Sequence, residues 1–448
     1  MKKYILMRTI CLLLLFAIIF PFITQDASAN SYAAEVPDVS RARQVYFANI
    51  DTGKIIIKKD ATSKIAPAST VKIMTGLIAI EHFKEKLDTP ITVTKSMLSA
   101  VEGTRMNLSP GDTLTAEDLM YGVICGGYND AAHVLAHVIA EDKRDFVSIM
   151  NKKANELGAK STNYTNPTGM DNENMYTTLE DTVIITKAAR KDPIYMEISS
   201  APSKLINFIN EKTPLTIYNR NSLISSYYSQ GYLNKYANGM IAGMTDNGGY
   251  CLVTEAVIKD ATYLCIVMGA VEQEGILYSY ETANSLISYA KDHFGFLEIN
   301  NSTIEICNVE IESALIKSDN ENGNSVKAVV KDTIKAYLPK ATDIATEISY
   351  KYYFYNEKIT APISAGTRIG SVDFYYNGEI VATAPLIIDT DIPANEFDLK
   401  TKDIRSAILS RKSLMSLISF IVLFSIWYYF FDYKKRRRNT RRINYKNF

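Results

Sequence analysis

The amino-acid sequence predicts an α+β fold, in which one antiparallel sheet is faced by a helical cluster and is followed by a small all-β domain. Three observations predict this class. Strand patterns lie at both ends of residues 30–298, apolar helical patterns lie between them, and short β-branched and aromatic runs fill residues 299–393. The chain has 448 residues, 47% of them hydrophobic, which is enough for more than one core. We therefore expect a first domain over 30–298 and a second over 299–393.

The strand signals of the first domain are a hairpin and a meander. Between Arg43 and Ile57, apolar residues alternate on both sides of the turn Asp51-Thr52-Gly53, which is typical of a hairpin. Three later apolar runs are separated by short turns and cover Asn238–Thr245, Tyr250–Ile258 and Tyr263–Ala270. These strands and the hairpin together predict the antiparallel sheet.

The helical signals begin at three places. After Ser69, apolar residues cover most of a helix's circumference, which predicts a buried central helix. Thr115, with Asp118 three residues later, resembles a capping box. A further helix begins at Asn129, with its apolar residues at helical spacing.

The first 29 residues have the pattern of a secretory signal. Lys2 and Lys3 begin a basic region, residues 10–23 are apolar, and Ala27-Ser28-Ala29 is a small-residue cleavage site. We expect the mature protein to begin near Asn30.

The last 55 residues predict a membrane anchor. A polar linker over 394–413 precedes residues 414–431, an uncharged run of 18 residues that is about the minimum length of a membrane-spanning helix. Eight lysines and arginines follow within residues 432–448, and basic flanks are typical of the cytoplasmic side. We therefore expect a single-pass cell-membrane protein whose ectodomain lies outside the cytoplasm and whose tail lies inside it.

Charge and cysteine content exclude several other classes. Without the signal and the residues from 411 onward, the chain has 36 basic and 47 acidic residues, a net charge of about −11 that argues against nucleic-acid binding. The cysteines outside the signal show no paired spacing, so no disulfide framework is expected.

His133 and His137 have a spacing that can chelate a metal, but no third ligand is evident, and no metal or cofactor is predicted. Cys125 has no neighbouring base or cation, which favours a structural thiol.

A candidate nucleophile stands where the first strand-rich stretch meets the central helix. Ser69 precedes Lys72 by three residues, about one helical turn, so the lysine amine can reach the serine hydroxyl. A serine needs a base beside it to attack a carbonyl, and a lysine with a lowered pKa can be that base. The pair predicts an acylation centre, although the spacing alone is common.

Several segments resemble one family of enzymes. The segments are Ala66–Thr75, Leu114–Ala132, Thr165–Asp171, Gly248–Ala256 and Ile359–Ile363. They are similar to the serine-type D-alanyl-D-alanine carboxypeptidases, the low-molecular-weight penicillin-binding proteins. The resemblance implies a penicillin-binding or β-lactamase-like transpeptidase domain, a substrate that is a peptidoglycan stem peptide ending in D-Ala-D-Ala, and acylation by β-lactams.

The sequence departs from two of the family's three motifs, Ser-x-x-Lys, Ser-x-Asn and Lys-Thr-Gly. The second falls on Gly127-Tyr128-Asn129, which keeps the asparagine and lacks the serine that relays a proton. The third falls on Ile241-Ala242-Gly243, which lacks the lysine and the threonine. The resemblance gives that lysine two roles, holding the terminal carboxylate and lowering the pKa of Lys72. With Ile241 in its place, we expect Lys72 to stay protonated.

Two hypotheses of different classes follow. The first is a slow or altered carboxypeptidase, which would use Ser69, Lys72 and Asn129 together with an oxyanion hole. The resemblance places this hole at the backbone N–H groups of Ser69 and Met244, beside Gly243. The losses at Gly127, Ile241 and Ala242 instead favour a catalytically degenerate homologue that binds muropeptides or a cell-wall synthesis partner.

Overall fold

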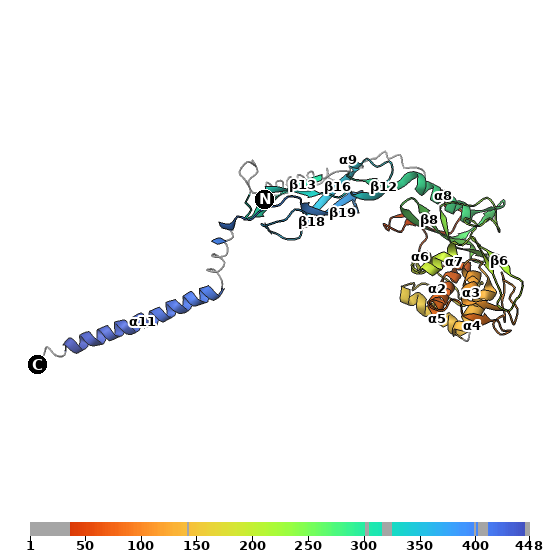
Figure 1. The fold of residues 1–448 in the computed structure, drawn as a ribbon, viewed down its shortest axis with the longest axis horizontal. Helices are drawn as coiled ribbons and strands as arrows, with labels where there is room; N and C mark the ends of the chain where they lie inside the picture. The colour runs from red at the N-terminus through yellow and green to blue at the C-terminus, as the bar shows by residue number, and fades with distance from the viewer. Residues whose placement is uncertain are drawn as a thin grey trace, which may run out of the picture. The chain divides into compact units, whose positions relative to one another are not determined.

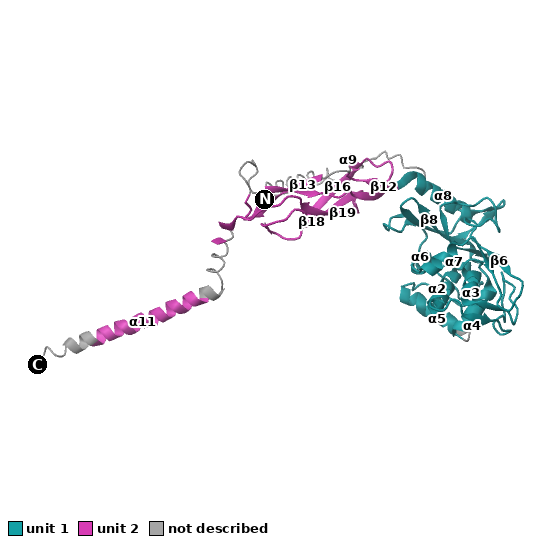
Figure 2. Cartoon of the chain, viewed as in Figure 1, with its two compact units in different colours: residues 1–294 teal, residues 295–448 magenta. Residues whose placement is uncertain are grey.

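The computed structural model describes most of the chain. The described residues are 36–140, 143–300, 304–315, 325–397, 400–401 and 411–443. The chain divides into two compact units, residues 1–294 and 295–448 (Figure 2). The predicted signal, residues 1–29, lies outside the described residues.

A five-stranded antiparallel sheet organises the first unit. Its order is β2 (Ile55–Lys59), β1 (Gln44–Asn49), β9 (Ala261–Ala270), β8 (Gly249–Ile258) and β7 (Ala237–Thr245). The hairpin and the meander form this sheet as the strand patterns predict. Strand β1 is buried at every position, β9 at nine of its ten positions and β8 at seven of ten, because helices cover both faces of the sheet. Figure 1 shows β8 between α8 (Tyr278–His293) and the other helices.

Six helices form the cluster on one side of this sheet (Figure 1). They are α2 (Val71–Phe83), α3 (Ala116–Ile124), α4 (Asn129–Ala140), α5 (Lys143–Leu157), α6 (Leu179–Ala189) and α7 (Pro193–Ser200). Eleven of the thirteen residues of α2 are buried, which confirms it as the central helix. The predicted cap is also present, since the Thr115 hydroxyl accepts a hydrogen bond from the Asp118 N–H at 3.0 Å. A short 3₁₀ turn, Ala68–Thr70, leads directly into α2.

Three short antiparallel strand pairs complete the first unit. They are β3 (Pro90–Thr92) with β4 (Thr113–Thr115), β5 (Ser203–Ile206) with β6 (Leu215–Tyr218), and β10 (Glu272–Gln273) with β11 (Ile276–Leu277). The segment that follows β6 leads back to the sheet through Asn219-Arg220-Asn221.

The second unit is built mainly of strands. Its six-stranded sheet has the order β16 (Ile348–Phe354), β18 (Thr367–Tyr376), β19 (Glu379–Ile388), β14 (Ser325–Val330), β13 (Ile304–Glu312) and β17 (Ile359–Thr360). Strands β12 (Phe294–Glu298) and β15 (Lys335–Pro339) pair separately, and one short helix, α9 (Ile344–Glu347), precedes β16. The second unit has a hydrophobic core of its own, which includes Ala328, Val372 and Leu386. A distinct β-rich domain is therefore present after the first unit.

One long helix follows the strands of the second unit. It is α11 (Arg411–Ile443), and its segment Met415–Arg437 is long and apolar enough to cross a membrane. Among the described residues, this is the one helix that meets that criterion.

Candidate active site

Ser69 and Lys72 lie together at the start of α2. The Lys72 Nζ donates a hydrogen bond to the Ser69 Oγ at 3.2 Å and another to the Thr168 carbonyl at 2.6 Å. One turn later, the Thr75 hydroxyl donates to the Pro167 carbonyl at 2.7 Å. The loop at 167–168 therefore fixes the first turns of α2 and holds the lysine amine against the serine. The predicted pair is formed in the structure.

Lys72 is an unusual lysine because its side chain is fully buried, with 1% of the residue exposed. Burial lowers its pKa, and the positive charge of Arg220 lowers it further, to about 7. A substantial fraction of the amine is then neutral near pH 7 and able to accept a proton. This differs from the expectation that Lys72 would keep its proton, because the amine is fully buried and because Arg220 supplies a nearby positive charge that position 241 does not.

Of the residues of the second motif, Gly127 lines the same pocket and Asn129 does not. Asn129 begins α4 with 4% of its surface exposed, and its Nδ2 donates to the Glu102 carbonyl at 2.7 Å. Gly127 lines the pocket and has a φ of +67°, a conformation that residues with a side chain rarely adopt. A Cβ at this position would lie 3.0 Å from the Cγ of Arg220. The absence of a side chain at 127 and the position of Arg220 are therefore coupled.

The third-motif residues lie on β7, the edge strand of the sheet. A Cβ on Gly243 would lie 2.3 Å from the Ser69 Cβ, so the strand backbone passes directly against the Ser69 side chain. Ala242, Gly243 and Met244 line the pocket, whereas Ile241 is fully buried in the hydrophobic core. The structure thus brings Gly243 and Ser69 together and leaves position 241 without a charge.

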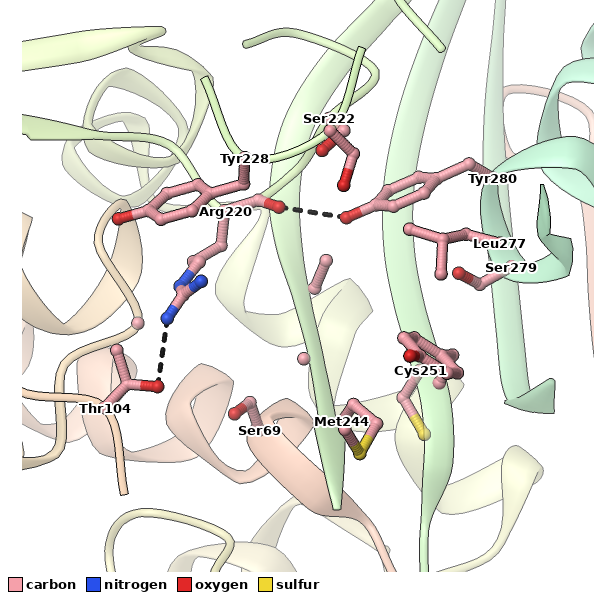
Figure 3. A pocket seen from close by; sticks show the side chains of 15 residues that line it. Ser69, Thr104, Arg220, Ser222, Tyr228, Met244, Cys251, Leu277, Ser279 and Tyr280 are labelled. Carbon is pink, nitrogen blue, oxygen red and sulfur yellow. Dashed lines mark hydrogen bonds between the residues drawn. The ribbon is translucent and has the colours of Figure 1, made fainter. Parts of the chain in front are cut away.

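Ser69, Gly127 and Gly243 line a pocket of about 290 Å³. Figure 3 shows Ser69 at the pocket with Arg220 and Thr104 beside it and Tyr280 on the opposite wall. The Nη2 of Arg220 donates to the Thr104 Oγ1 at 2.9 Å, and its guanidinium carbon lies 4.0 Å from the centroid of the Tyr228 ring. Sequence reasoning missed Arg220, Thr104 and Tyr228, because Thr104 precedes the other two by more than a hundred residues in the chain. The only local signal was an arginine between two asparagines, which is too common a pattern to indicate a site.

Two other features that the sequence singled out are Cys125 and a possible metal site. Cys125 is buried, its Sγ lies 3.5 Å from the Ala201 carbonyl, and burial raises its pKa to about 12. Such a thiol is a poor nucleophile. Among the described residues, no group of three histidine, cysteine, aspartate or glutamate side chains is placed to hold a metal ion.

In this chain, helices cover both faces of an antiparallel sheet, Ser-x-x-Lys lies at the start of the central helix, and a β-rich unit follows the first unit. This is the architecture of a penicillin-binding protein. Residues 30–272 match the D-alanyl-D-alanine carboxypeptidase family, and residues 310–394 match the penicillin-binding protein 5 C-terminal domain. The chain belongs to this family of serine carboxypeptidases, the low-molecular-weight penicillin-binding proteins.

Individual relatives are distant but extend over most of the chain. The D-alanyl-D-alanine carboxypeptidase DacF of Bacillus subtilis is 26% identical over 83% of this chain and 90% of its own length. DacC of Escherichia coli is 27% identical over 83% of this chain and 89% of its own length. Among solved structures, penicillin binding protein 5 from Haemophilus influenzae superposes with a TM-score of 0.57 at 25% identity, covering 80% of this chain and 99% of that one.

Proposed function

We propose that this protein is a D-alanyl-D-alanine carboxypeptidase that acts on peptidoglycan stem peptides through a Ser69 acyl-enzyme, with Lys72 as the base. The observation that carries the proposal is the contact between the buried Lys72 amine and the Ser69 hydroxyl at 3.2 Å. A lysine with a pKa near 7 meets the usual requirement for a general base at neutral pH.

In the proposed reaction, the Ser69 Oγ attacks the carbonyl carbon of the penultimate D-alanine while its proton passes to the neutral Lys72 amine. The tetrahedral oxyanion is stabilised by the backbone N–H groups of Ser69 and Met244, which the family resemblance assigns to this role. The amide C–N bond then breaks, and Lys72 returns the proton to the departing D-alanine amine. Water, deprotonated by the same amine, releases the shortened peptide from the serine.

We expect the turnover to be slow. The resemblance implies three catalytic side chains that this chain lacks. They are the second-motif serine, replaced by Gly127, and the third-motif lysine and threonine, replaced by Ile241 and Ala242. Loss of one acid–base or oxyanion-stabilising group lowers a rate by roughly two to four powers of ten, and losses within one unit need not add.

We also propose that the protein is anchored in the cell membrane by the helix within Met415–Arg437, with the basic tail in the cytoplasm and both folded units outside it. The length and composition of this helix support the anchor. The eight basic residues after position 431 support the orientation.

The alternative is a homologue that binds muropeptides or a wall-synthesis partner without turnover, and the three absent motif side chains favour it.

Two measurements separate the alternatives. Labelling of the purified ectodomain with a fluorescent β-lactam tests acylation, and release of D-alanine from a peptide ending in D-Ala-D-Ala tests turnover. We expect both signals in the natural protein and neither in Ser69→Ala. An adduct on another residue, or one that persists in Ser69→Ala, would exclude Ser69 as the nucleophile.

A further inference from the structure

The pocket beside Ser69 contains one positively charged side chain that the family's three motifs do not account for. Arg220 is fixed through its backbone on both sides, because its N–H donates to the Cys125 carbonyl at 3.0 Å and its carbonyl accepts from the Tyr280 hydroxyl at 2.9 Å. Its guanidinium donates to Thr104 and stacks on the Tyr228 ring (Figure 3). The side chain is therefore held in one orientation at the pocket wall.

The chemistry of the pocket wall suits an anion. Of the fifteen described residues that line the pocket, none is acidic and Arg220 is the only one with a charged side chain. Eight of the others carry a hydroxyl group, namely Ser69, Thr104, Ser222, Tyr228, Ser229, Tyr250, Ser279 and Tyr280. A guanidinium has five N–H donors, and the hydrogen bond to Thr104 uses one of them. The remaining donors can bind a carboxylate through two parallel hydrogen bonds.

The residues at positions 127 and 241 bear on whether this arginine can serve the pocket. Gly127 leaves open the space against the Arg220 Cγ, because a Cβ there would approach it to 3.0 Å. At position 241, the residue is a fully buried isoleucine, so β7 supplies no competing cation. Among the described residues that line the pocket with Ser69, Arg220 is thus the one that carries a charged side chain.

We propose that Arg220 binds the C-terminal carboxylate of the peptide substrate, in the role of the lysine that is absent at position 241. This inference rests on the function proposed above, since it takes the ligand to be a peptide that ends in a free carboxylate. It makes Arg220 a specificity-determining residue, because the pocket then selects peptides that end at the residue to be released.

The test measures binding without turnover. In a Ser69→Ala background, calorimetry compares a peptide ending in D-Ala-D-Ala with the same peptide carrying a C-terminal amide. We expect the acid to bind at least about tenfold more tightly than the amide, the lower end for a hydrogen bond to a charged group. Adding Arg220→Gln should abolish this preference by weakening the acid alone. The matched control is Lys235→Gln, which removes an exposed cation that lies over the Tyr236 ring, and it should leave the preference unchanged.

The outcomes separate a carboxylate contact from a merely structural role. Equal weakening of both peptides by Arg220→Gln, or no change in either, would overturn the proposal. If Arg220→Gln does not fold, Thr104→Val removes only the hydrogen bond that orients the guanidinium, and it should weaken the acid several-fold without affecting the amide. Equal changes in both peptides would again overturn the proposal. Because this readout is binding, absence of D-alanine release would refute the proposed turnover without deciding the role of Arg220.

Discussion

Replacement of Gly243 by alanine should inactivate the site while leaving the protein folded. The added Cβ would lie 2.3 Å from the Ser69 Cβ and 2.5 Å from its Oγ, whereas non-bonded carbon atoms favour separations of about 3.5–4.0 Å. The serine or strand β7 must therefore move by about 1 Å or more. A displacement of about 1 Å at a reacting group can lower a rate roughly a hundredfold, and overpacking usually lowers the free energy of unfolding by about 1–3 kcal/mol.

The assay for this prediction is the rate of covalent labelling of Ser69 by a fluorescent β-lactam, measured beside thermal unfolding. We expect Gly243→Ala to be labelled at least about a hundredfold more slowly than the natural protein and to unfold cooperatively. The control is Gly295→Ala, where the new Cβ would meet only the flexible end of Lys340 at 3.4 Å. Labelling of Gly243→Ala at nearly the natural rate would show that β7 does not pass against the nucleophile as described.

Three further predictions concern pH, the second motif and the anchor. The labelling rate should rise with pH and reach half its maximum near pH 7, because the neutral form of Lys72 is the base and its pKa is lowered to about 7; a flat profile between about pH 5 and 9 would contradict this role. Gly127→Ser alone should not raise D-alanine release and should lower the free energy of unfolding by about 1–3 kcal/mol, seen by denaturant titration, because φ is +67° and Arg220 is close. A chain that ends at Asp403 should leave the membrane pellet as a soluble, folded protein, since the folded units have cores of their own; its retention in the pellet would refute the anchor.

Local patterns were sufficient to predict much of the fold. The alternation around residues 51–53 predicts a hairpin, and β1 and β2 pair across that turn. Thr115 and Asp118 mark the start of α3 because a cap depends on residues only three positions apart. The Ser69–Lys72 contact was likewise predictable, since one helical turn sets the distance between the two side chains.

The electrostatics of the site could not be read from the sequence in the same way. The pKa of Lys72 depends on its complete burial and on Arg220, which lies 148 residues further along the chain. Motif comparison gives the identity of a residue at position 127 but neither its φ nor its distance from the Arg220 side chain. Both are consequences of the tertiary path that brings the segment after β6 against the loop between α3 and α4.

The contact between Gly127 and Arg220 also constrains how the protein can change by mutation. A serine introduced at position 127 would meet both a positive φ and the Arg220 Cγ. Loss of Arg220 as the first step would instead remove the pocket's one charged side chain among the described lining residues. The two positions are therefore epistatic, and their effects should not add. The structure therefore opposes a single substitution at either position, because each change disturbs the pocket through the other residue.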